Sequence, residues 1–286
     1  MIDGVSVILR ALGFIAIFQA AGMAVFLALF QRGLAAATIA ALRRTGLATA
    51  LAALILVAGH FVLEPARLGG ELGAIADSGL RDIVLDSPLA SAFAWRASGL
   101  ILLVIGFSPP AHLERFVTLA GTTLVLFAFT QAGHTTTHSP QWLLGALLFI
   151  HIAAVAFWFG SLLPLRRIAV QEPSQTVGRI VEAFSRLAVK IVPLLATAGL
   201  ALAILLLGNW SNLATPYGGL LLLKIGLFSI LMLLAALNRW RYGPALKSGA
   251  PRAAAAFNAT VVAEIILIGA ALASTAVLTA FYSPAD

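Results

Sequence analysis

The five histidines are the residues whose chemistry and spacing stand out in this chain. His134 and His138 flank the turn 133-GHTTTHSP-140, and two imidazoles at this i, i+4 spacing could share one metal ion on a continuous helix. His60 ends an apolar segment, and His151 lies inside another, about 15 Å from its start at about 1.5 Å per residue. Imidazole binds copper, zinc, iron and nickel, so histidines alone do not select the metal. Their arrangement predicts metal capture at one mouth of a bundle and relay inward through His151.

Each of these histidines also has a structural interpretation. His60 could cap its helix or lie at the membrane interface, and His151 could make a hydrogen bond between two helices. His112, in the turn 108-SPPAHLER-115, is interpreted as a surface residue. Trp158 follows His151 by seven residues, on nearly the same helix face, and either walls a cavity beside it or simply packs.

Charged side chains inside apolar segments are costly, and Arg96, Lys224 and Glu264 occupy such positions. Glu264 lies near the middle of its segment and needs either a partner or protonation. Arg96 and Lys224 lie at a similar depth to each other, so we expect one of them to pair with Glu264. The alternative is that Glu264 belongs to a proton or cation relay.

Other ligands and catalytic groups are scarce. The chain has no cysteine, which excludes disulfides, thiolate metal sites and covalent haem attachment. After Met1 it has only Met23 and Met232, so it lacks the methionine ladder that would suit Cu(I). No GxxxxGK[ST] motif, HExxH motif or nucleophile constellation is present, and we expect a protein that is not an enzyme.

The elements that position these residues must be membrane-spanning helices. The 286 residues are 61% hydrophobic and only 10% charged, whereas soluble domains are about a quarter charged. The predicted fold is all-α, a single transmembrane domain over 1–286 with about eight helices. The apolar segments that predict them cover residues 5–30, 42–63, 89–107, 115–133, 141–164, 184–208, 217–238 and 255–281.

The basic residues orient this bundle. Lys and Arg concentrate in the loops after the first, third, fifth and seventh segments, which places those loops in the cytoplasm and explains the net charge of +7 without nucleic acid. Both termini are therefore predicted outside, in the periplasm of a Gram-negative bacterium, with the multi-pass chain in the inner membrane. The acidic outer connection 64–88 could carry a short helix lying at the lipid interface or be a solvated loop.

Several motifs give the chain a family resemblance. They are 133-GH-134, 151-HIAAVAFWFG-160, 184-FSRLA-188, 215-TPYGGLLLLK-224 and 237-LNRWR-241. Through them the segment 133–241 resembles the copper resistance protein D (CopD) family of inner-membrane proteins. The resemblance implies a copper-handling protein with a periplasmic copper-binding partner. The positions that match the family are His134, His151, Trp158, Gly160, Thr215, Tyr217, Gly218 and Lys224.

Three functional hypotheses follow. In the first, an inner-membrane copper transport or homeostasis protein captures copper at His134 and His138, with His60 as a third ligand, and passes it toward His151. The residues assigned to its pathway or ion pair are Glu264, Lys224, Arg96, Trp158 and Tyr217. In the second hypothesis, His60 and His151 hold a b-type haem in a membrane redox protein. In the third, the chain receives copper and delivers it to another protein without transporting it.

Overall fold

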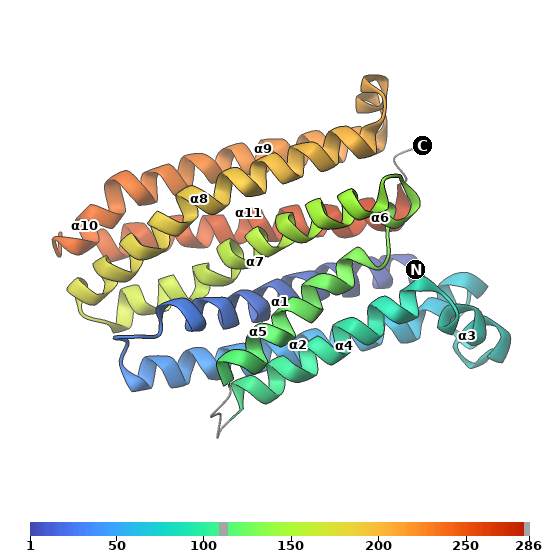
Figure 1. Ribbon diagram of the computed structural model, residues 1–286, viewed down its shortest axis with the longest axis horizontal. Coiled ribbons are helices and arrows are strands. Elements are labelled where there is room, and N and C mark those ends of the chain that lie inside the picture. The colour runs from blue at the N-terminus through green and yellow to red at the C-terminus, as the bar shows by residue number, and fades with distance from the viewer. Residues whose placement is uncertain (109–113, 283–286) are drawn as a thin grey trace.

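The computed structural model describes residues 1–108 and 114–282, except for the side chains of Glu114 and His134. Within these residues the chain is a bundle of long helices joined by short connections (Figure 1). The bundle helices are α1 (Ile2–Phe30), α2 (Ala36–Gly69), α4 (Pro88–Phe107), α5 (Glu114–Phe127), α7 (Gln141–Gln171), α8 (Ser174–Leu207), α9 (Pro216–Leu237) and α11 (Ala253–Phe281). The all-α prediction is confirmed.

Each predicted apolar segment corresponds to one of these helices, with one difference in length. In the described part of the chain seven helices are long and apolar enough to cross a membrane, and the shorter apolar helix is Arg115–Thr130. That helix is α5 with its 3₁₀ continuation at Ala128–Thr130, and it ends before the predicted boundary at residue 133. The turn Gly133–Pro140 follows, with the four-residue helix α6 at His134–Thr137.

The structure extends several helices beyond their apolar segments. α2 and α8 each have 34 residues, or about 51 Å at about 1.5 Å per residue, against a hydrocarbon core of about 30 Å. Their charged ends therefore project into the headgroup regions. The connection 64–88 carries a 3₁₀ turn at Leu72–Ala76 and the helix α3 (Ser78–Leu85), where Asp77 accepts a hydrogen bond from the Leu80 N–H. A short helix was one of the two expectations for this connection.

The chain crosses the bundle back and forth, so both termini lie at the same end as α3 and α6 (Figure 1). The opposite end carries the π-helical turn Asn238–Tyr242 and α10 (Gly243–Lys247). This arrangement is the one that an even number of crossings produces. The prediction that the end with the termini faces the periplasm remains a prediction from the basic loops.

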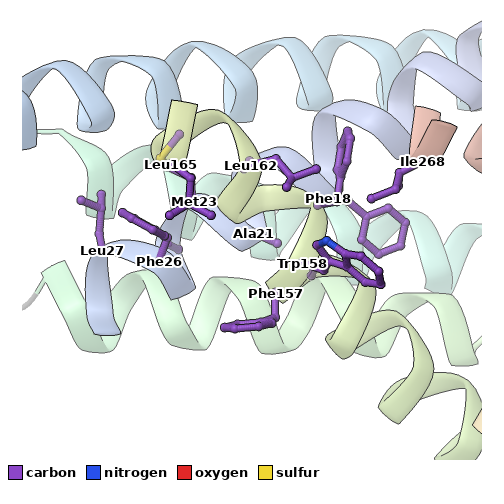
Figure 2. Close-up of a cluster of buried hydrophobic side chains, with 14 of the residues drawn as sticks. Phe18, Ala21, Met23, Phe26, Leu27, Phe157, Trp158, Leu162, Leu165 and Ile268 are labelled. Carbon is purple, nitrogen blue, oxygen red and sulfur yellow. The ribbon is translucent and has the colours of Figure 1, made fainter. Parts of the chain in front are cut away.

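The core of the bundle forms around α1, which packs on α2 and α7 and also contacts α5 and α11. Gly22 of α1 and Gly160 of α7 allow the two backbones to touch, since a Cβ on Gly160 would lie 2.7 Å from the Gly22 carbonyl carbon. This close approach is what small residues permit inside membranes. Met23 is fully buried in the same cluster of apolar side chains (Figure 2), so it serves packing.

Candidate functional site

His151 of α7 is anchored to the backbone of α8. Its Nδ1 lies 3.1 Å from the carbonyl oxygen of Leu195. Because a carbonyl oxygen can only accept a hydrogen bond, Nδ1 carries the ring proton and donates it, and the neutral ring keeps its free lone pair on Nε2. Metal-binding histidines commonly have one ring nitrogen held in this way. This contact is the hydrogen bond between two helices that the structural interpretation expected, and it also orients the ring as in a metal ligand.

Gly199 makes this anchor possible. A Cβ at residue 199 would lie 2.8 Å from Cε1 and 2.9 Å from Nδ1 of His151, closer than side chains tolerate. The imidazole thus occupies space that only a glycine leaves open on α8. Both His151 and Gly199 belong to the segment that carried the family resemblance.

Glu264 of α11 accepts hydrogen bonds from two neutral donors. Trp158 donates from Nε1 to Oε2 at 2.9 Å, and Asn238 donates from Nδ2 to Oε1 at 2.6 Å. The hydroxyl of Thr260 in turn donates to the Asn238 side-chain oxygen. Glu264 is buried, with 2% of its surface exposed. Neutral hydrogen-bond donors can therefore hold this carboxyl group in place without a cation.

The predicted ion pair of Glu264 with Arg96 or Lys224 was wrong. Within the described residues the polar partners of Glu264 are Trp158 and Asn238. Asn238 was not among the predicted site residues, although an amide side chain at the end of the apolar segment 217–238 could have indicated a polar contact there. Trp158 does not simply pack, because its indole N–H holds Glu264 while its ring packs edge-on against Phe228.

Lys224 and Arg96 lie in different surroundings. Lys224 of α9 is half-buried. Arg96 of α4 stacks over the ring of Phe129, with its guanidinium carbon 4.6 Å from the ring centroid. Among the described residues, the buried Nε of Arg96 has no hydrogen-bond partner. The two cations therefore belong to separate parts of the bundle.

His60 belongs to a charge cluster rather than to an open ligand site. Its Nε2 lies 3.2 Å from Nε of Arg10 and 3.3 Å from Oε1 of Glu64. Glu64 is paired with Arg67, which also contacts Asp3. The Nε2 of His60, which was predicted as a third metal ligand, is thus engaged by protein groups. Arg10 was missed, although it is a charged residue inside an apolar segment of the sequence.

The expected outer histidine cluster is not assembled as a helical pair. The helix α6 ends at Thr137, and His138 follows it in an extended conformation, with Nδ1 3.1 Å from the Thr137 hydroxyl. The His134 side chain and all of His112 lie outside the described residues. Among the side chains that are described, no group of three or more His, Asp or Glu is placed to hold a metal ion.

The predicted haem pair finds no support in this geometry. His60 and His151 lie on α2 and α7, and the protein groups that engage their rings are different. In His60, Nε2 is the atom that faces Arg10 and Glu64. A haem iron would need that nitrogen free on both rings.

The motif 215-TPYGG builds the start of α9. The Thr215 hydroxyl accepts a hydrogen bond from the Gly218 N–H, and Pro216 occupies the first helical position. Gly218 has no room for a Cβ, because the backbone of the 3₁₀ turn Trp210–Ala214 touches it. Tyr217 is buried in a small apolar cluster with Leu207 and Leu278. The motif therefore shapes a helix end.

Comparisons with known proteins match most of the chain. The family model described as "Copper resistance protein D-like, N-terminal domain" matches residues 1–140, and the model described as "Copper resistance protein D" matches residues 178–278. The likeness thus reaches well beyond the predicted segment 133–241, on both sides. No solved structure matches the chain.

Two curated proteins are similar to the chain at low identity. A copper resistance protein D of Pseudomonas syringae pv. tomato is 27% identical over 221 residues, which cover 72% of this chain and 71% of that protein. The inner membrane protein YebZ of Escherichia coli K12 is 26% identical over 187 residues, 60% of this chain and 61% of that protein. With the multi-helix bundle and the two family models, the chain belongs to the copper resistance protein D family of multi-pass inner-membrane proteins.

Proposed function

We propose that this protein transports copper through the membrane, with His151 as the ligand at the centre of the path. The observation that carries the proposal is the anchored imidazole. Its Nδ1 is engaged by Leu195, so the remaining ring nitrogen is free to bind a metal ion inside a membrane-spanning helix. Imidazole suits both oxidation states of copper, and the absence of cysteine fits a path built on nitrogen and oxygen ligands.

A single imidazole ligand suits passage rather than storage. Conduction requires sites that bind strongly enough to admit an ion and weakly enough to release it.

Glu264 of α11 offers the next ligand beyond His151. Trp158, which holds its carboxyl group, follows His151 by seven residues, or about 10 Å at about 1.5 Å per residue. The second hydrogen bond, from Asn238, lies where the π-helical turn begins at the far end of α9. An acidic group inside a membrane bundle commonly marks an ion or proton path. Copper, or a proton that moves with it, passes from His151 to Glu264 in this proposal.

Capture at the mouth completes the proposed path. His134 and His138 lie at the end of the bundle that carries α3. The acidic residues Glu71, Asp77 and Asp82 lie at the same end, in the connection 64–88. A periplasmic copper-binding protein is the proposed partner at this end. His60 is left out of the ligand set because its Nε2 faces Arg10 and Glu64. No catalytic step is proposed.

The test is copper flux into liposomes that contain the purified protein and a copper-responsive dye. His151→Ala should lower the flux by about tenfold or more, because it removes the central ligand. Glu264→Gln should also lower it, because it removes the carboxylate; its amide oxygen still accepts from Trp158, but its NH2 replaces the oxygen that accepts from Asn238. Matched controls are Ile150→Ala on the exposed face of α7 and Ser274→Ala on α11, whose hydroxyl bonds only within its own helix.

Different outcomes separate the hypotheses. Wild-type flux in His151→Ala would overturn the proposed path. Copper binding without flux in the wild-type protein would favour the delivery module instead. Stoichiometric iron with a haem absorption band that His151→Ala abolishes would favour the redox protein.

A further inference from the structure

A groove open at the side of the bundle lies apart from the proposed copper path. It has a volume of about 700 Å³ and is lined by α1, α2 and α7, with Ile265 of α11 at its edge. Its wall on α2 is made of small residues, among them Ala48 and Ala52, and its floor on α1 includes Leu12 and Ile15. Most of the lining is therefore complementary to a hydrocarbon chain.

The two charged groups of this groove gather at one end. Arg44 of α2 and Arg167 of α7 both line it, and Arg44 is exposed. Arg167 reaches across to α2, where its Nη1 lies 3.4 Å from the Thr45 hydroxyl, and its Nε donates to Gln171. A guanidinium has five N–H donors, so Arg167 keeps donors for an anion after these two contacts.

The two arginines lie near the boundary between the hydrocarbon and the lipid headgroups. Arg44 is about 12 Å from the start of α2, and Arg167 is about 6 Å from the end of α7, at about 1.5 Å per residue. α2 exceeds the hydrocarbon core by about 20 Å, so about 10 Å projects at each end when the helix is centred. The groove thus runs from the headgroup region into the hydrocarbon, with its charge at the outer limit.

We propose that this groove binds one anionic phospholipid from the leaflet at the end opposite the termini. The phosphate lies between Arg44 and Arg167, and an acyl chain lies along the alanine wall of α2. Charge complementarity selects this occupant, because a neighbouring apolar helix would leave the two guanidinium groups without an anion. Neither His151 nor Glu264 lines the groove, so the lipid site can be tested independently of copper transport.

The absence of cysteine makes a spectroscopic test direct. Ala48→Cys places a label one turn from Arg44 inside the groove, and Leu233→Cys places one on the exposed face of α9. The full chain, labelled with bimane, is reconstituted with brominated phosphatidylglycerol or brominated phosphatidylcholine, which quench the dye on contact. At Ala48 the anionic lipid should quench at least twice as strongly as the zwitterionic lipid. At Leu233 the two lipids should quench equally.

The arginines are tested by substitution. Arg44→Gln combined with Arg167→Gln should abolish the preference at Ala48, whereas the exposed neighbour variant Arg166→Gln should keep it. Native mass spectrometry of the unlabelled protein should show one retained phosphatidylglycerol that the double variant loses. Equal quenching by the two lipids at Ala48 would overturn the proposal. So would protection of Ala48 from both lipids, which would indicate a second copy of the chain or another helix in the groove.

Discussion

At the scale of single residues, the imidazole rings of His60 and His151 have different partners: charged side chains for His60 and a backbone carbonyl for His151. The Nε2 of His60 lies near both the Arg10 guanidinium and the Glu64 carboxylate, so two charged side chains engage that ring nitrogen. The ring of His151 gives only Nδ1 to the protein, at the Leu195 carbonyl. Burial alone does not separate these two roles. The identity of the group that each ring nitrogen meets separates them.

The space that Gly199 leaves for the His151 ring predicts the effect of adding one methyl group at residue 199. Gly199→Ala should push the imidazole away from Leu195, because its Cβ would lie 2.8 Å from Cε1. The overpacking costs about 1–3 kcal/mol, and the gain in helix propensity offsets about 1 kcal/mol of it. Stability measured by thermal unfolding in detergent should therefore fall by less than about 2 kcal/mol, while copper flux falls as in His151→Ala.

The control for this variant is Gly226→Ala in α9, where a Cβ meets nothing within 4 Å. It should leave flux unchanged and raise stability by up to about 1 kcal/mol. Wild-type flux in Gly199→Ala would mean that the position of His151 does not matter for transport.

At the scale of elements, the bundle depends on the crossing of α1 and α7. The two helices touch through Gly22 and Gly160, and the surrounding core includes Phe18, Met23 and Leu162 (Figure 2). Since α7 also carries His151 and Trp158, this contact fixes the depth of the candidate ligands relative to the rest of the bundle. The glycine pair is thus a positioning feature for the whole site.

Gly22→Ala should disrupt this crossing, because its Cβ would lie 2.5 Å from Gly160 Cα and would overlap the Ala156 carbonyl oxygen. Backbone atoms cannot move aside as a side chain does, so we expect a loss of about 3 kcal/mol or more in unfolding free energy. Gly13→Ala on the same helix is the matched control, with its closest contact at 3.9 Å. Equal thermal stability of the two variants would contradict the role given to the glycine pair.

At the scale of the whole molecule, the position of the termini and the distribution of charge define the two ends of the bundle. N- and C-termini, α3 and α6 lie at one end, and the basic residues Arg239, Arg241 and Lys247 lie at the other (Figure 1). The positive-inside rule predicts that the second end faces the cytoplasm. On that prediction the proposed capture site faces the periplasm, and the lipid groove opens its charged end toward the cytoplasmic leaflet.

This orientation predicts a labelling pattern for two single cysteines in the cysteine-free chain. Ser78→Cys in α3 should react with a membrane-impermeant maleimide in spheroplasts, and Ser248→Cys beyond α10 should react only after the membrane is permeabilised. Both positions are exposed, so reactivity reports the side of the membrane rather than burial. The reverse pattern would invert the proposed capture side and the leaflet of the lipid site.

The sequence by itself determined the class of the protein and the order of its helices. Long apolar runs have few alternatives to helices in a bilayer, because every backbone polar group must be bonded within the segment. The same physics made His151 and Glu264 recognisable as costly polar groups inside those runs.

Only the tertiary structure decided which polar groups meet. Sequence distance gives depth along a helix but not the direction that each helix turns toward its neighbours, so the expected partner of Glu264 was a cation and the observed partners are Trp158 and Asn238. Arg10 reaches His60 from a different helix, and Gly199 admits His151 from another. These contacts depend on helix rotation and packing, which are set by side-chain shapes across the whole bundle.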